Sequence, residues 1–282
     1  MRIWHQGFVD FDKVPVYRKS FGEHLERVID PGVELTIHGM RPGIFGDFTP
    51  IEALHNAYVE SVLVAEICEA ALCAERLGYD AVAVNCFYDP GLREARSIVN
   101  IPVVSLFESC MATSISLGGA VGMLALNEDQ CDKHRELSLA YGLSGRLAAT
   151  VPIDPPIDEY VLEGGSAQTA DIEKGIYRAC ARLRSAGADV IVPGDGVLND
   201  FVWRRSIAPD GVTMLDAAAV LVRHATHLAG LSRALGMGTA RSGRYANSDA
   251  HILAYIREFA GRQPMSEGNF SGVGTVTQSL TL

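Results

Sequence analysis

The chain of 282 residues is long enough for a sizeable hydrophobic core and for one or two domains. Hydrophobic residues make up 48% and charged residues 21%, the balance of a soluble globular protein, and the formal net charge of −10 argues against a general nucleic-acid surface. The opening "MRIWHQGFVDFDK" has no apolar signal core and no apolar run reaches about 18 residues, so we expect a cytoplasmic protein without a membrane partner.

Short apolar runs alternate with helical stretches along the chain. The predicted strands are 2–9, 33–38, 81–86, 103–107, 120–126, 147–151, 190–194 and 212–215, and the clearest predicted helices are 50–77, 128–141, 171–186 and 216–235. The apolar runs do not alternate with polar residues, which is typical of strands buried on both faces. This pattern predicts an α/β fold with mainly parallel sheet, flanked by helices.

An internal repeat divides the predicted fold into two halves. "GYDAVAVNC" begins at Gly78 and "GADVIVPGD" begins at Gly187, an offset of 109 residues (187 − 78). The same offset pairs "VVSLF" from Val103 with "VTMLD" from Val212. An eight-stranded barrel should show more than two related units. We therefore expect two pseudo-symmetric lobes, each a four-stranded mainly parallel sheet, with the active site in the cleft between them.

The repeat also predicts the domain boundaries. Residues 1–107 with 216–260 should form the first lobe, 108–215 the second, and 261–282 an extended tail. One helix is predicted at about 249–260, with Ser248 as its N-cap. The rest of the C-terminal region is rich in Gly and Ser and cannot fold alone. We expect it to lie on another surface, such as a neighbouring subunit, and hence a homo-oligomer.

A thiol and a carboxylate occupy equivalent positions in the two halves. Cys86 ends the strand 81–86, and the offset of 109 carries it onto Asp195. Ligands bind outside the carboxyl ends of parallel strands, so the two side chains should face each other across the cleft. A helix after the turn that follows Cys86 would lower the pKa of the thiol. Asp195 either acts as an acid or base, or caps the next helix.

The six cysteines form no CxxC pair and no close Cys/His cluster, so we expect no metal site. The glycines in "GGAVG" come before a strand, which is the wrong order for a dinucleotide-binding loop. We therefore expect neither a metal nor an organic cofactor. The expected partner is a small-molecule substrate.

Three stretches carry a resemblance to a known family: "NCFYDPGLREA", "IPVVSLFES" and "GADVIVPGDG". They resemble the aspartate/glutamate racemase superfamily, and most closely its hydantoin and allantoin racemase branch. The resemblance implies two pseudo-symmetric α/β lobes with one catalytic cysteine each. One thiolate removes the proton on Cα and the other thiol returns a proton to the opposite face. Cys86 takes the position of the first cysteine, and Asp195 replaces the second.

The sequence departs from this family again at its N-terminus. An Asn- and hydroxyl-rich turn usually follows the first strand, whereas here the strand continues into "WHQGFVDF". Because the hydroxyl cluster is missing, we expect a substrate other than a simple amino acid. The predicted substrate-binding residues, beside the catalytic pair, lie at strand ends and their following turns: His5, Gln6, Asn85, Phe87, Glu108, Asn127, Gly194 and Gly196.

The sequence thus predicts a cofactor-independent racemase or isomerase that transfers protons at a carbon next to a carbonyl, in a hydantoin-like ring or a related cyclic amide or acid. The alternative is a decarboxylase or lyase, because one branch of the superfamily protonates an enediolate with a single cysteine. That branch keeps the second-lobe cysteine, whereas this chain keeps the first. A hydrolase with Cys86 as nucleophile and a non-catalytic binding protein are further alternatives.

Overall fold

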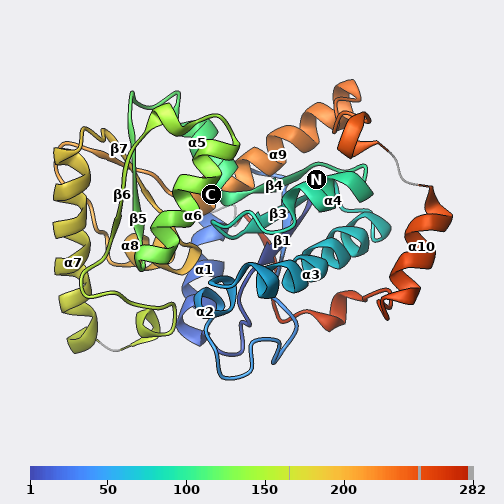
Figure 1. The fold of residues 1–282 in the computed structure, drawn as a ribbon, viewed down its shortest axis with the longest axis horizontal. Helices are drawn as coiled ribbons and strands as arrows, with labels where there is room; N and C mark the ends of the chain where they lie inside the picture. Colours follow the sequence, from blue (N-terminus) through green and yellow to red (C-terminus); the bar gives the residue numbers. More distant parts are fainter. Residues whose placement is uncertain (165, 247–248, 279–282) are drawn as a thin grey trace.

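Two separate β-sheets form the centres of two halves of the molecule (Figure 1). The computed structural model describes residues 1–164, 166–246 and 249–278. The first sheet has the order β4-β3-β1-β2-β9 and the second the order β6-β5-β7-β8. Their strands are β1 (Arg2–Gly7), β2 (Glu34–His38), β3 (Ala81–Asn85), β4 (Val103–Ser105), β5 (Val121–Ala125), β6 (Leu147–Pro152), β7 (Val190–Pro193), β8 (Thr213–Met214) and β9 (Gly272–Thr277).

The two sheets have the same topology. Read from its other end, the second sheet is β8-β7-β5-β6, which repeats the order β4-β3-β1-β2 of the first. Within each set of four, neighbouring strands are parallel. The predicted architecture of two pseudo-symmetric α/β lobes is therefore confirmed, apart from the additional strand β9.

Helices cover both faces of the sheets, which explains the continuous apolar strands. On β1, Trp4 belongs to a core shared with α3, whereas Ile3 belongs to a second core that extends into the other lobe. α9 packs against β3, β4 and α5. The helices are α1 (Pro15–Val28), α2 (Pro50–Leu54), α3 (Ala57–Arg76), α4 (Leu92–Ile98), α5 (Leu106–Ser114), α6 (Glu128–Ala140), α7 (Ser166–Ser185), α8 (Gly196–Arg204), α9 (Ala217–Leu235) and α10 (Ala250–Phe259), with short 3₁₀ helices η1 (Ser144–Arg146), η2 (Val161–Glu163), η3 (Gly243–Tyr245) and η4 (Glu267–Asn269).

The helix predicted at 50–77 is two helices. Asn56 interrupts it, because its side chain accepts hydrogen bonds from the backbone N–H groups of Tyr58 and Val59 and so starts α3. The start of α10 is capped by Asp249, whose carboxylate accepts from the N–H of His251. Ser248, predicted as this cap, lies outside the described residues.

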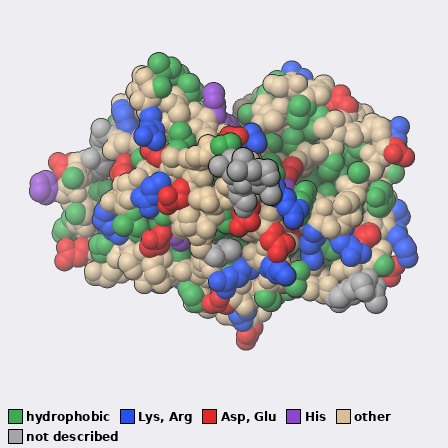
Figure 2. All heavy atoms as spheres, turned by 180° about the vertical axis from the view of Figure 1, so that it is seen from behind, with side chains coloured by type: hydrophobic (Ala, Val, Ile, Leu, Met, Phe, Trp, Pro, Cys, Tyr) green, Lys and Arg blue, Asp and Glu red, His purple; other side chains and the backbone are tan. Residues whose placement is uncertain are grey.

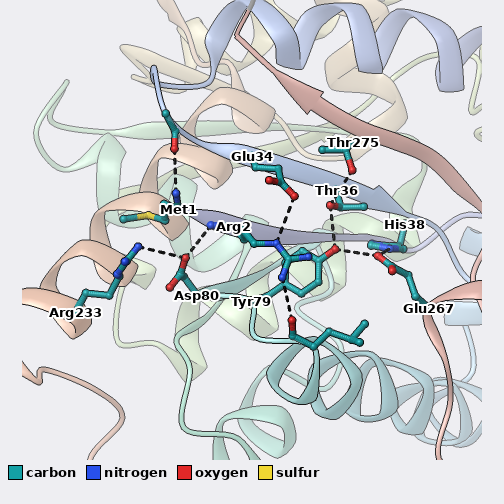
Figure 3. A network of polar contacts seen from close by, with 12 residues as sticks. Met1, Arg2, Glu34, Thr36, His38, Tyr79, Asp80, Arg233, Glu267 and Thr275 are labelled. Carbon is teal, nitrogen blue, oxygen red and sulfur yellow. Dashed lines mark hydrogen bonds and ion pairs between the residues drawn. The ribbon is translucent and has the colours of Figure 1, made fainter.

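The C-terminal segment lies on another surface, as predicted, but this surface is the first sheet of its own chain and not a neighbouring subunit. β9 pairs antiparallel with β2 and provides a fifth strand. Figure 3 shows the polar contacts around this edge. Glu267 accepts a hydrogen bond from the hydroxyl of Tyr79 at 2.8 Å and lies 2.9 Å from Nε2 of His38. Buried Phe270 packs edge-on against Trp4. These contacts supply the partner surface that the segment cannot provide by itself.

Acidic and basic side chains are intermingled on the face of the molecule shown in Figure 2. That face therefore has no extended surface of one charge. Within the described parts of the chain, no helix is long and apolar enough to cross a membrane.

Candidate active site

A small cavity of about 30 Å³ lies where the two lobes meet, with walls from both. A volume of this size holds about one water molecule and is too small for a ring-sized ligand. α2 provides three apolar residues of the wall. The segments that follow β3 and β7 provide a thiol and a carboxyl group, those of Cys86 and Asp195. The cavity is lined by Phe8, Val9, Tyr17, Pro50, Ile51, Leu54, Asn85, Cys86, Phe87, Tyr88, Gln130, Glu159, Asp195, Gly196 and Val197.

Cys86 follows β3 directly and reaches the cavity from the first lobe. Burial raises the pKa of its thiol well above the usual value; a hydrogen bond from the Tyr88 backbone opposes this, and the Asp195 carboxylate adds to it. The expected lowering by a helix N-terminus is therefore wrong. α4 begins only at Leu92, beyond the turn, and desolvation of the thiolate dominates. At neutral pH Cys86 is therefore a thiol.

Asp89 holds the turn that follows Cys86. Its backbone adopts a left-handed conformation, with φ of 44°. Its carboxylate accepts hydrogen bonds from the backbone N–H groups of Phe107 and Glu108 and from the hydroxyl of Tyr141, at 2.8–3.0 Å. Burial raises the pKa of Asp89 to about 6. The carboxylate thus joins the thiol-bearing turn to α5 and to the end of α6.

Asp195 lines the cavity from the second lobe and also caps α8. Its Oδ1 accepts from the backbone N–H groups of Val197 at 2.8 Å and Leu198 at 2.9 Å. The side chain of Gln130 provides a further hydrogen bond that favours the carboxylate. Burial nevertheless raises the pKa of Asp195 above its usual value. The two interpretations of Asp195, helix cap and cavity carboxylate, are therefore compatible in one side chain.

Three further predicted residues line the same cavity: Asn85, Phe87 and Gly196. Asn85 donates a hydrogen bond to the hydroxyl of Tyr17 at 2.8 Å. At Gly196 a side chain would have its Cβ 3.2 Å from the Asn85 amide, so glycine allows the close approach of the two lobes. Burial and nearby carboxylates raise the pKa of Tyr17 well above its usual value, so its hydroxyl stays protonated.

The other five predicted residues lie outside the cavity lining. Gln6 donates to the carbonyl oxygens of Gly7 and Gly39 and accepts from Trp4, while His5 is fully buried beside Phe21. Both lie within β1 and not after it, and their side chains point into the protein core, so the strand-end pattern is wrong for them. Glu108 forms a two-pronged ion pair with Arg96, Asn127 caps α6, and the carbonyl of Gly194 accepts from His134.

Glu159 and Tyr17 are cavity residues that the sequence analysis missed. Glu159 lies in the loop before η2 and is 3% exposed, and Tyr17 lies in α1 and is 1% exposed. Neither directly follows a strand, so the strand-end pattern does not include them. The sequence does show a carboxylate at Glu159, in the Pro-rich stretch "IDPPIDEY" between β6 and η2. The burial of Glu159, however, depends on contacts with α2, which is distant in the sequence.

The residues 25–225 match the family model described as Asp/Glu/Hydantoin racemase. The chain belongs to the Asp/Glu/hydantoin racemase family. Among curated proteins, none matches this sequence. Within the described residues, no group of three His, Cys, Asp or Glu side chains could hold a metal ion.

Solved structures similar to this family member include two allantoin racemases. The enzyme from Klebsiella pneumoniae is 20% identical, with a TM-score of 0.69 over 88% of this chain and 94% of its own. The enzyme from Pseudomonas fluorescens is 21% identical, with a TM-score of 0.68 over 88% and 97%. A liganded double mutant of arylmalonate decarboxylase is 14% identical, with a TM-score of 0.50 over 86% and 97%. At these identities the likeness is one of fold.

Proposed function

We propose that this protein is a cofactor-independent racemase or isomerase that moves protons at a carbon next to a carbonyl, in a hydantoin-like ring or a related cyclic amide or acid. The observation that carries the proposal is that Cys86 and Asp195 line one small cavity from opposite lobes. A planar enolate held between them would have one proton-transfer group on each face. The family match supports the same reaction class.

We assign a different resting state to each group. Cys86 is protonated because burial raises its thiol pKa. Burial raises the pKa of Asp195 as well, but hydrogen bonds from Val197, Leu198 and Gln130 favour its carboxylate form. In the forward direction Asp195 takes the proton from Cα and Cys86 delivers one to the other face. General acid–base catalysis of this kind contributes about 10²- to 10⁴-fold to a rate.

The negative charge of the enolate needs hydrogen-bond donors around its oxygen. The protonated hydroxyl of Tyr17 and the amide of Asn85 are at the cavity wall and can donate to it. Because the cavity holds about one water, the site has to widen to admit a ring, and we assign this movement to α2, which supplies three apolar residues of the wall. Closure excludes water, which strengthens each of these contacts.

The test is incubation in D₂O with a panel of hydantoins, cyclic amides and malonates, followed by NMR. Exchange of a Cα proton without loss of carbon, together with loss of optical activity, is the expected result. No exchange with any neutral carbon acid, at protein concentrations where binding is detected, would contradict the proposal.

A decarboxylase is the second candidate, and one observation favours it. Cys86 is the only thiol among the described residues that line the cavity, and it is held protonated, as a one-acid reaction on an enediolate requires. The arylmalonate decarboxylase structure shares the fold at a TM-score of 0.50. Release of carbon dioxide from a malonate in the same panel would identify this reaction.

We also propose a cytoplasmic homo-oligomer that acts on a small molecule. All six cysteines are free, as expected in a reducing compartment. α10 buries none of its described residues and exposes Ile252, Tyr255, Ile256 and Phe259, each 55% or more. A ten-residue helix is marginal without tertiary packing, so a second copy covering this stripe would explain it. Light scattering of the intact chain tests the assembly.

A further inference from the structure

Glu159 is a buried carboxyl group at the cavity that the proposed mechanism does not use. Its side chain lines the same cavity as Cys86 and Asp195, although the residue is only 3% exposed. The backbone N–H of Ile51, in α2, donates to the carboxyl group. The other oxygen, Oε2, has no hydrogen-bond partner among the described residues. A polar atom left unpaired in an enclosed site is unfavourable unless a ligand satisfies it.

The surroundings of Glu159 disfavour an anion. The titratable groups that face it are the Asp195 carboxylate from α8, Asp158 in its own loop, and the phenol of Tyr88 with the thiol of Cys86 beyond it. None of the described residues that line the cavity is Lys or Arg. Two carboxyl groups at one site without a cation cannot both be ionised at low energy. One of the two therefore holds a proton.

The hydrogen bonds decide which carboxyl group is protonated. Asp195 accepts from Val197, Leu198 and Gln130, all of which favour its charged form. Glu159 has an unpaired oxygen and lies deeper. Burial and the Asp195 charge together raise the pKa of Glu159 well above its usual value. Glu159 is accordingly the neutral partner, with its Oε2 unpaired beside the cavity.

We propose that Glu159 is a catalytic carboxylic acid, which donates a hydrogen bond from Oε2 to the carbonyl oxygen of the substrate and stabilises the enolate, and that it makes the cavity select uncharged carbonyl compounds over carboxylates. This inference rests on the proposed function. The proton stays on Glu159 throughout: the hydrogen bond strengthens as charge develops on the substrate oxygen, and no bond to Glu159 breaks. A substrate carboxylate would instead face the charge of Asp195 with no cation to offset it.

The first experiment needs no turnover. The infrared carbonyl band of a protonated carboxylic acid is recorded at pH 7 for the intact protein and for Glu159→Gln. Gln keeps an oxygen acceptor for the Ile51 N–H, so the fold around α2 is retained. The matched control is Asp158→Asn, one residue away, where the side chain is partly exposed and accepts from the N–H of Val161.

The band is expected in the wild type and in Asp158→Asn and is expected to be absent in Glu159→Gln. A wild type without the band at pH 7 would show that Glu159 is ionised and overturn the inference, whether or not the protein is a racemase. Conversely, a protein with the band but without exchange on any substrate would overturn the proposed function alone.

The second experiment measures Cα exchange in D₂O with a neutral hydantoin. Glu159→Met lacks the donor and should lose about 10²-fold or more in kcat, the loss typical of one oxyanion donor. Glu159→Gln keeps an N–H donor and should stay within about tenfold of the wild type, and it should lack the fall in kcat that ionisation of Glu159 causes at high pH. Equal kcat in the wild type and Glu159→Met would overturn the catalytic role. Equal exchange of the hydantoin and its ring-opened carboxylate would overturn the selectivity.

Discussion

Asp195→Asn separates the chemical role of this residue from its structural one. The amide oxygen of Asn can accept from the N–H groups of Val197 and Leu198 as Oδ1 does, and Asn is as good an N-cap as Asp. The hydrogen bond from Gln130 is at risk, which costs about 1 kcal/mol. Removing a buried carboxylate offsets part of this loss. We therefore expect a melting temperature close to that of the wild type.

The reaction should respond differently, because an amide cannot take a proton from carbon. Loss of a general base lowers the rate by about 10²- to 10⁴-fold, which corresponds to a barrier higher by about 3–5 kcal/mol. Inversion is followed by circular dichroism and Cα exchange by NMR in D₂O. Asp195→Asn should stop inversion and nearly all exchange, because Cys86 rests as a thiol and is a poor base. Cys86→Ser should stop inversion, because a serine hydroxyl is a very weak acid, and leave at most exchange on the Asp195 face.

The matched control is Asp189→Asn at the other end of β7. This carboxylate also accepts from two backbone N–H groups, those of Gly119 and Ala120, but it lies outside the cavity. It should leave inversion and exchange unchanged. If Asp195→Asn keeps full inversion while Cys86→Ser is inactive, Asp195 is only a helix cap, and the two-group mechanism is refuted in favour of a single-acid reaction.

Further measurements test other parts of the structure. Deletion of 263–282 should lower the melting temperature, because it removes β9 and buried Phe270; an unchanged melting curve would contradict the role of β9 in the first sheet. Burial raises the pKa of Asp200 from 3.8 to about 6, so its contribution to stability is present below about pH 4 and is lost as pH rises to about 6. Asp200→Asn should therefore match the wild type at pH 4 and be more stable at pH 7 by up to roughly 3 kcal/mol in urea unfolding; a difference independent of pH would be the opposite result. In racemisation, the two enantiomers should differ in kcat and in KM separately, as progress curves in each direction can show.

Much of the fold could be predicted because the signals for it are local. Buried strands such as β3 and β7 are short apolar runs, and their offset of 109 residues gave the relation between the lobes before any contact was known. The same offset predicts that Cys86 and Asp195 are equivalent positions. Both line one cavity, because equivalent strand ends in two facing lobes lie at the same cleft.

The remaining features depend on contacts between distant segments. β9 exists because β2 has an open edge for "GVGTVT" to pair with, and nothing within that stretch shows which edge it joins. A position near a strand end predicts cavity residues only in part, since Gln6 satisfies its hydrogen bonds inside the first lobe. Glu159 reaches the cavity through a loop whose path depends on α2. Sequence patterns therefore predict the reactive side chains at strand ends, Cys86 and Asp195, better than the loop and helix residues that complete the cavity.

The asymmetry of the proposed proton-transfer pair should give the two enantiomers different kinetic constants, within a limit that thermodynamics sets. The two lobes are equivalent in topology, but the mechanism proposed above pairs a protonated thiol in one with a carboxylate in the other. One enantiomer meets this resting form, and the other needs a Cys86 thiolate with a protonated Asp195. Because enantiomers have equal free energies, the ratio kcat/KM must be the same in both directions. The asymmetry therefore has to appear in kcat and KM individually, with compensating ratios. After each forward turnover the proton returns from Asp195 to the buried thiolate, and burial of that thiolate favours this return.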